Sequence, residues 1–214
     1  MSEELFEKAA EAVCDGNVDK AVELAETAVE ENIDPLKMIE KGFTVGITEV
    51  GDLFDQGEVF LPQLMSCSEA MKAASDILKE AAVEQGKDQE ENITVVIGSV
   101  AGDVHDIGKG IVKTLLEANG MDVYDLGTEV SVDDFISKAK EVDADVISTS
   151  SLLTTTMAEN EKLINTLKEE NLREQFDVLV GGAPVTEEWA EEIEADGYGE
   201  TANQAVKVVY DLVG

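Results

Sequence analysis

The sequence has very little of several residue types that carry common chemistries. Its 214 residues include one histidine, two cysteines and three prolines, and aromatic residues make up only 5% of the chain. A structural zinc site needs about four Cys or His ligands, so one histidine and two distant cysteines exclude it. Cys14 and Cys67 each lie inside a helical pattern, and we expect both thiols to fill the core.

Basic residues are also scarce. Fifteen Lys and Arg stand against 48 Asp and Glu, which gives a formal net charge of −33. A surface of that charge repels phosphate backbones and anionic lipid, which excludes nucleic acids and membranes as partners. The start, MSEELFEKAAEAV, lacks the features of a signal peptide, and no apolar run reaches about 18 residues. We expect a cytoplasmic protein whose charge serves solubility, with adaptation to high salt as the alternative.

Helical periodicity runs through residues 1–87. Apolar residues recur at helical spacing in four stretches, with short connections between them. The first stretch ends at Gly16, and Asn17 is the predicted cap of the second. Asp34 is the predicted N-cap of the third helix, and Pro35 is its predicted first helical residue. The pattern predicts a four-helix bundle over 1–87.

After a polar linker at 88–92 the pattern changes to alternating strands and helices. Short β-branched runs, beginning with ITVVIGSV, alternate with amphipathic stretches over 93–214. This alternation predicts an α/β domain with a flavodoxin-like (Rossmann-like) five-stranded parallel sheet in the order 2-1-3-4-5. In such sheets ligands bind beyond the carboxyl ends of the strands, where the strand order reverses.

Three unusual loops follow predicted strands at that edge. GDVHDIG (102–108) follows the first strand, STSSLLTTT (148–156) includes the end of the third, and VGGAP (180–184) the end of the fourth. His105 is the only histidine, and Asp103 is near enough in sequence to reach its imidazole. A carboxylate on Nδ1 fixes the tautomer and presents Nε2 as a basic ligand. One histidine cannot hold a bare metal ion, but a metal chelated by a macrocycle needs only an axial ligand.

The glycines of the first loop suit a large flat ligand. Gly102, Gly108 and Gly110 remove side chains where such a ligand or its tail would approach the backbone. Their spacing does not fit a Walker loop, and Lys113 stands where a dinucleotide fingerprint needs glycine. A hydrolase triad built on the histidine would lack the G-x-S-x-G elbow. The threonine run at 154–156 has the alternative reading of a helix cap.

Three separated elements resemble the cobalamin-binding pattern of base-off, histidine-on corrinoid proteins. D-x-H-x-x-G spans 103–108, S-x-L spans 150–152 and G-G is 181–182, in the spacing of that family. The helical stretch GDLFDQGEVFLPQLMSCSEAMK also matches, so the resemblance covers essentially the whole chain. The sequence is similar to the corrinoid subunits of methylamine, methanol and methoxyarene methyltransferase systems, and to the cobalamin module of methionine synthase.

The resemblance implies a cofactor and roles for individual residues. The cofactor would be cobalamin, as methylcob(III)alamin or cob(I)alamin, or a related corrinoid. His105 would be the lower axial ligand of cobalt, Asp103 would hydrogen-bond His105, and the Thr156 hydroxyl would complete this relay. Ser150 would contact the displaced benzimidazole. The implied cofactor-binding residues are Gly102, Asp103, Val104, His105, Asp106, Ile107, Gly108, Ser150, Leu152, Thr154, Thr156, Gly181, Gly182, Leu61 and Met65.

The helical half would cover the methyl-bearing face of the corrin. Phe60, Leu61 and Met65 are the candidates for that cover, and the core of the bundle is an equally compatible place for them. Each methyl transfer would then require the bundle to move about the 88–92 linker.

The implied function is that of a methyl carrier in one-carbon metabolism such as methanogenesis or acetogenesis. A substrate-specific methyltransferase would load the methyl group, a second would accept it, and a reductive activation protein would restore the cofactor. The stretch GGAPVTEEWAEEIEADGYGETA resembles methylamine-type subunits, which favours methylated amines, while methanol, quaternary amines and methoxyarenes stay open. The alternative is a cobalamin-dependent sensor, which needs an output segment that we do not expect. A radical-mutase subunit or a flavodoxin-like domain without cobalamin would leave the helical cap or the three-part motif unexplained.

Overall fold

The computed structural model describes residues 2–86 and 92–214, which form two compact units. One unit comprises Met1–Asn92 with Glu117–Gly120, and the other comprises Ile93–Leu116 with Met121–Gly214. Residues 88–91 of the predicted linker lie outside the described residues. None of the helices in the two described segments is long and apolar enough to cross a membrane.

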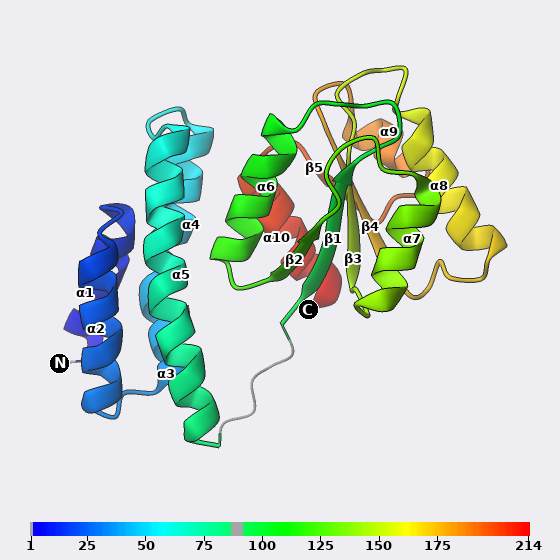
Figure 1. Ribbon diagram of the computed structural model, residues 1–214. Helices are drawn as coiled ribbons and strands as arrows, with labels where there is room; N and C mark the ends of the chain where they lie inside the picture. Colours follow the sequence, from blue (N-terminus) through cyan, green and yellow to red (C-terminus); the bar gives the residue numbers. More distant parts are fainter. Residues whose placement is uncertain (1, 87–91) are drawn as a thin grey trace. The chain divides into compact units, whose positions relative to one another are not determined.

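The first unit is helical, as the apolar periodicity predicts (Figure 1). Its elements are α1 (Ser2–Cys14), α2 (Val18–Glu30), α3 (Pro35–Met38), a π-helical turn (Ile39–Phe43), α4 (Thr44–Asp55) and α5 (Leu61–Glu84). The Asn17 side chain accepts a hydrogen bond from the Lys20 N–H, so it caps α2 as predicted. Asp34 caps α3 in the same way, through the N–H groups of Leu36 and Lys37.

The third predicted helix differs from expectation because a π-helical turn interrupts it. Met38, Phe43 and Ile47 are all fully buried. Met38 and Phe43 are five residues apart, a spacing that an α-helix places on different faces and a π turn places on one face. The π turn therefore lets both side chains enter the core before the α-helical spacing resumes at Ile47.

The second unit alternates strands and helices in the predicted order. Its elements are β1 (Thr94–Ser99), α6 (Ile107–Ala118), β2 (Asp122–Asp125), α7 (Val132–Glu141), β3 (Val146–Ser150), α8 (Ala158–Glu169), β4 (Asp177–Gly181), α9 (Glu187–Glu192), β5 (Gly197–Gly199) and α10 (Ala202–Val213). The five strands pair in parallel in the order β2-β1-β3-β4-β5. The predicted flavodoxin-like fold and strand order are confirmed.

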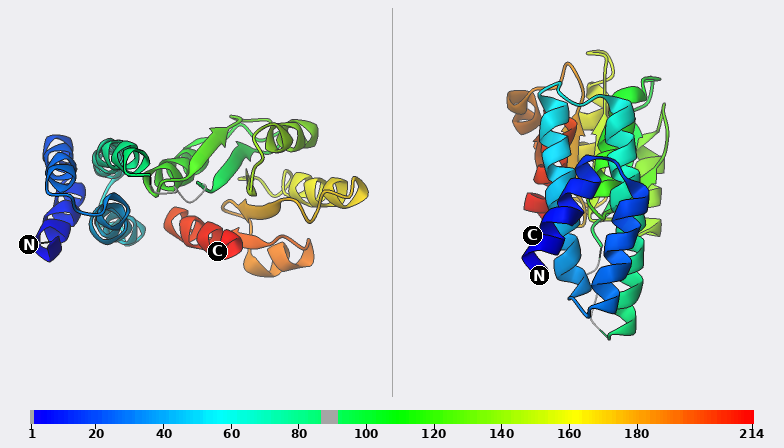
Figure 2. Two further views of the ribbon diagram at one scale, coloured as in Figure 1. Left: turned by 90° about the horizontal axis from the view of Figure 1, so that it is seen from below. Right: turned by 90° about the vertical axis from the view of Figure 1, so that its left-hand side faces the viewer.

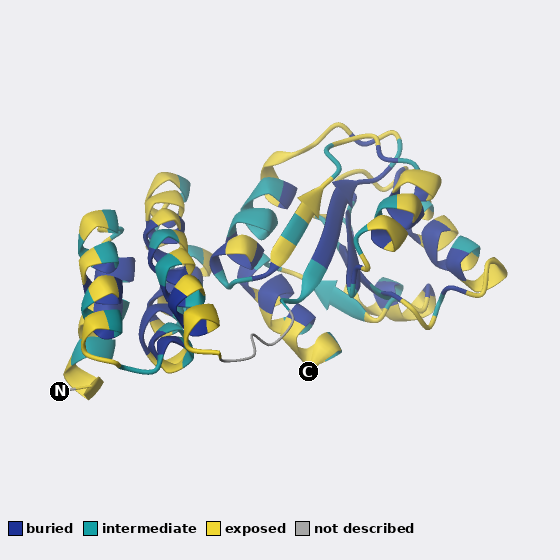
Figure 3. Ribbon diagram, turned by 60° about the horizontal axis from the view of Figure 1, so that its bottom comes forward, coloured by how far each residue is buried: buried dark blue, intermediate teal, exposed yellow. Residues whose placement is uncertain are grey.

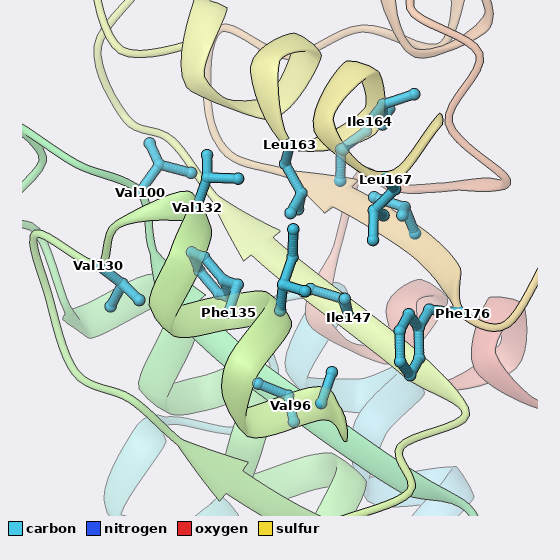
Figure 4. Packing of buried hydrophobic residues seen from close by; sticks show 14 of the residues in the cluster. Val96, Val100, Val130, Val132, Phe135, Ile147, Leu163, Ile164, Leu167 and Phe176 are labelled. Atoms are coloured by element: carbon cyan, nitrogen blue, oxygen red, sulfur yellow. The ribbon is translucent and has the colours of Figure 1, made fainter. Parts of the chain in front are cut away.

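Helices cover both faces of this sheet. Figures 1 and 2 show α7, α8 and α9 on one face and α6 and α10 on the other. Phe135 of α7 and Leu163 of α8 lie in one buried cluster with Val96 of β1 and Ile147 of β3 (Figure 4). Because both faces are covered, β1 is buried along most of its length, as Figure 3 shows.

The register of the central strands aligns their carboxyl ends. Ser99 at the end of β1 pairs with Ser150 at the end of β3, and Ser150 pairs with Gly181 at the end of β4. The loops that follow these three strands therefore leave the sheet side by side, at the edge where the order reverses between β1 and β3.

Candidate functional site

The center of this edge is the carboxylate of Asp103, which is 0% exposed. Its Oδ1 accepts a hydrogen bond from the backbone N–H of His105 at 3.1 Å and lies 2.7 Å from His105 Nδ1. Its Oδ2 accepts from the backbone N–H groups of Leu152 at 2.7 Å and Leu153 at 3.3 Å. The hydroxyl of Thr156 donates to the same oxygen at 3.0 Å. One buried side chain thus joins the loop after β1 to the loop after β3.

The hydrogen bonds keep this carboxylate charged. Burial alone would raise the pKa of Asp103, but the bonds from the His105 side chain and backbone, the Leu152 N–H and the Thr156 hydroxyl lower that pKa to about 2. An ionised carboxylate can only accept hydrogen bonds, so Nδ1 of His105 carries a proton. In the neutral imidazole, Nε2 then has the free lone pair, as the sequence argument predicts.

His105 is oriented on one side and accessible on the other. Its side chain is 46% exposed while its Nδ1 is held by the buried carboxylate. Exposed apolar residues lie on or beside both loops: Val104 and Ile107 are close to His105 in the sequence, and Leu152 and Leu153 donate their N–H groups to Asp103. In the described parts of the chain, no group of three or more metal-ligating side chains gathers to hold a metal ion. The site offers one directed nitrogen donor beside apolar surface, which fits a metal already held in a large organic ring.

Thr156 belongs to the buried network and not to the helix end. It is buried, and its hydroxyl lies 3.0 Å from Asp103 Oδ2 and 2.9 Å from the carbonyl oxygen of Leu153. The N-cap position of α8 is Met157, and no side chain caps it there. The alternative that the threonine run caps α8 is therefore wrong.

Glycines shape the backbone around the network. Gly182 has φ +128°, and a Cβ there would lie 1.9 Å from the carbonyl oxygen of Ser151, so no side chain can be placed at this position. Gly102 has φ +78°, a conformation that side-chain-bearing residues rarely adopt. A Cβ on Gly108 or Gly110 would meet nothing within 4 Å, which leaves open space along the first turn of α6.

The predicted site residues of the α/β unit fall into two groups. The structure brings Asp103, His105, Leu152 and Thr156 into direct contact through hydrogen bonds. The others lie on the loops after β1, β3 and β4 or at the ends of the elements that flank these loops, namely Gly102, Val104, Asp106, Ile107, Gly108, Ser150, Thr154, Gly181 and Gly182.

The remaining predicted residues lie in the helical unit, at the start of α5. Phe60 is 68% exposed, Met65 is 50% exposed and Leu61 is partly exposed. The alternative that Phe60 and Met65 fill the bundle core is wrong.

Sequence reasoning missed three contributors to this edge. The hydrogen bond from the Leu153 backbone N–H to Asp103 cannot be predicted from the order of side chains. Ser99 donates its hydroxyl to the carbonyl oxygen of His105, and Lys109 is buried beside Asp106. The sequence holds one hint of Ser99, a polar residue at the end of a buried strand. It holds one hint of Lys109, a lysine inside the apolar run IGKGIV.

Comparisons with known proteins agree with this geometry. A family model described as a B12 binding domain matches residues 93–207, and a second model with that description matches residues 5–79. Trimethylamine corrinoid protein 1 of Methanosarcina acetivorans is 44% identical over 207 residues, which are 97% of this chain and 96% of that protein.

Solved structures give the same result. A cobalamin-binding protein from Desulfitobacterium hafniense DCB-2 matches with a TM-score of 0.81 and 32% identity, over 98% of each chain. The methanol:cobalamin methyltransferase complex MtaBC from Methanosarcina barkeri matches with a TM-score of 0.79 and 32% identity, over 99% of this chain and 80% of that one. The chain belongs to the family of B12-binding corrinoid proteins, and its cofactor is cobalamin or a related corrinoid.

Proposed function

We propose that the protein is a corrinoid methyl carrier in which Nε2 of His105 replaces benzimidazole as the lower axial ligand of cobalt. The observation that carries this proposal is the 2.7 Å contact between Nδ1 of His105 and the buried Asp103 carboxylate. The bound corrin would supply four equatorial ligands and a cobalt center that accepts and releases a methyl group. The protein's own residues would orient the imidazole and bind the rest of the cofactor.

Asp103 holds the imidazole ready to bind. Its charge keeps the proton on Nδ1 and the lone pair on Nε2, and strengthens Nε2 as a donor. When Nε2 binds a cationic center, Nδ1–H becomes a stronger donor to Asp103. Whether or not Nε2 is bound, the contact between Nδ1 and Asp103 would keep the imidazole oriented.

Thr156 lets the carboxylate adjust to these changes. Its single hydroxyl proton has two acceptors within 3.0 Å, namely Asp103 Oδ2 and the Leu153 carbonyl oxygen. Turning the hydroxyl toward Asp103 stabilises the carboxylate, and turning it away leaves more negative charge for the imidazole.

The other site residues bind the remainder of the cofactor. Gly108, Leu152 and the 181–182 glycines would bind the displaced tail, to which Ser150 and Thr154 would offer hydroxyl groups. Gly102, Val104, Asp106 and Ile107, next to His105 in the sequence, would bind the ring. Leu61 and Met65, with Phe60, would be the contribution of the helical unit to cofactor binding. The open space at Gly108 and the exposure of Phe60 and Met65 support these assignments.

The proposed division of labor follows the two units. Residues 1–87 form the cover and 93–214 bind the cofactor, a division that the two compact units support. The partners are a substrate-specific methyltransferase, a second methyl-accepting methyltransferase and a reductive activation protein. Methylated amines are the favoured methyl donors, supported by the relative named a trimethylamine corrinoid protein. The match to a chain of a methyltransferase complex supports a methyltransferase partner.

The single histidine permits a direct test. The protein is grown with [15N]histidine, reconstituted with hydroxocobalamin and reduced to the cobalt(II) state, whose electron paramagnetic resonance spectrum records the axial nitrogen. Coordination by His105 gives a doublet splitting from 15N, whereas benzimidazole gives a triplet from 14N. His105→Ala should lose the doublet. A triplet in the wild-type protein, or no bound corrinoid, would overturn the proposal.

A further inference from the structure

His105 has a second support that does not involve Asp103. Ser99 ends β1, is almost fully buried and donates its hydroxyl to the carbonyl oxygen of His105 at 2.6 Å. Lys109 lies in the first turn of α6 and is 2% exposed. Its Nζ lies 2.8 Å from Asp106 Oδ1 and also donates to Asp125 Oδ1 at the end of β2. Two consecutive residues, 105 and 106, are thereby tied to the sheet.

A buried lysine needs such partners to stay charged. Burial alone would lower the pKa of Lys109, but its hydrogen bonds to Asp106 and Asp125 raise that pKa above its usual value. Asp125 is itself fixed, because its Oδ1 accepts the N–H of Gly127 at 2.9 Å. The ammonium group therefore links a rigid point at the sheet edge to the residue that follows His105.

We propose that Ser99 and Lys109 are positioning residues that fix the main chain under His105, an inference that rests on the proposed axial role of His105. Asp103 sets the direction of the ring and the place of its proton. Ser99 and Lys109 fix the backbone from which the His105 side chain extends. The side chain can then form or lose a bond at Nε2 while the loop stays in place. Less conformational freedom is then lost when His105 binds cobalt, which strengthens coordination.

Lys113 provides a matched control on the same helix. Its Nζ lies 3.6 Å from Asp125 Oδ2, and it is more exposed than Lys109. It has no ion pair with Asp106 among those the described residues form. Lys113→Met removes the same charge from the same neighborhood as Lys109→Met, but leaves the link to the His105 loop intact.

The test measures how strongly His105 competes for cobalt. The [15N]histidine holoprotein in the cobalt(II) state is titrated with unlabeled imidazole, and the doublet is replaced by a triplet as imidazole displaces His105. Lys109→Met should lower the imidazole concentration at the midpoint by about 10-fold, the lower end of losses for residues that orient a metal ligand. Ser99→Ala should lower it about 5-fold, as expected for one lost hydrogen bond. Lys113→Met should stay within about twofold of wild type.

The outcomes separate this inference from the proposed function. If the wild type shows no doublet, the axial role of His105 fails and the inference fails with it. If the doublet is present and Ser99→Ala titrates like the wild type, the inference fails while the proposed function stands. An equal drop in Lys109→Met and Lys113→Met would assign the effect to charge alone and would also overturn it. If Lys109→Met does not fold, Ser99→Ala still tests the inference, because it removes only one hydroxyl.

Discussion

The two units use their buried polar groups differently. In the α/β unit, Asp103 and Lys109 are almost fully buried, and each has two or more hydrogen-bonding partners at the carboxyl edge of the sheet. In the described part of the helical unit the buried polar residues are Ser68 and Ser75, and no charged side chain is buried. The α/β unit therefore contains a specified polar site, whereas the helical unit is an apolar bundle that exposes Phe60 and Met65.

This contrast shows what each architecture can provide. Parallel strands in register bring three distant loops together, so a histidine, a carboxylate and a hydroxyl can meet without being close in sequence. The described part of the helical unit instead buries almost only apolar side chains. Matched substitutions in the two units test whether they are as separable as this contrast implies.

The largest effect is expected at Gly182. Gly182→Ala would place a Cβ 1.9 Å from the Ser151 carbonyl oxygen in a conformation with φ +128°. The loops after β3 and β4 must then separate, at a cost of about 3 kcal/mol or more. Corrinoid binding should be lost, and denaturant unfolding should show a destabilised α/β unit.

Gly46→Ala is the matched change in the helical unit. A Cβ at Gly46 would lie 2.5 Å from the carbonyl oxygen of Ala10, so α1 and α4 must move apart. This variant should be destabilised to a similar degree while keeping the His105 doublet. Loss of the doublet in Gly46→Ala would show that the site depends on the bundle.

A smaller but specific effect is expected at Asp103. Asp103→Asn keeps the shape of the side chain but removes the charge that orients His105, which should weaken His105 coordination by about 10- to 100-fold. Imidazole competition measures this change. Asp196→Asn is the control, because Asp196 Oδ2 also accepts a backbone N–H, from Val178 at 2.6 Å, where β4 begins. A comparable loss of coordination in Asp196→Asn would refute the specific role of Asp103.

Much of this site was predictable because its signals are local. Cap residues such as Asn17 and the alternation of short apolar runs determine where elements begin and how the strands pair. The pairing of Asp103 with His105 followed from a separation of two residues. The role of Thr156 as partner of Asp103 came only from the family resemblance.

Other features depend on tertiary packing that no local pattern encodes. The π turn arises because Met38 and Phe43 must share one face. Lys109 is buried only because Asp106 and Asp125 come together around it. Phe60 is apolar but exposed, so its hydrophobicity could not tell whether it lies in the bundle core or on the surface.

The depressed pKa of Asp103 predicts an acid-dependent loss of stability in the α/β unit. Its pKa is about 2 in the folded protein, against an ordinary value of 3.8 for an aspartate side chain. A carboxyl whose folded pKa is lowered stabilises the fold above its unfolded pKa, and that contribution is lost as the pH falls through its folded value. The wild type should lose about 2 kcal/mol more than Asp103→Asn between about pH 5 and pH 2. Parallel curves of unfolding free energy against pH for the two proteins would contradict the assignment.

The smallest effect is expected at Thr156, and it separates the hydroxyl from the methyl group. Thr156→Val keeps the packing but removes the donor to Asp103, and a net loss of about 1 kcal/mol corresponds to roughly 5-fold weaker His105 coordination. Thr156→Ser keeps the hydroxyl and loses the methyl group, whose Cγ2 would lie 3.6 Å from a Cβ at Gly102. If the relay acts through the hydroxyl, imidazole competition should place Thr156→Ser near the wild type and Thr156→Val below it. The reverse order would mean that Thr156 supports the loop by packing, and that Asp103 orients His105 without help from this hydroxyl.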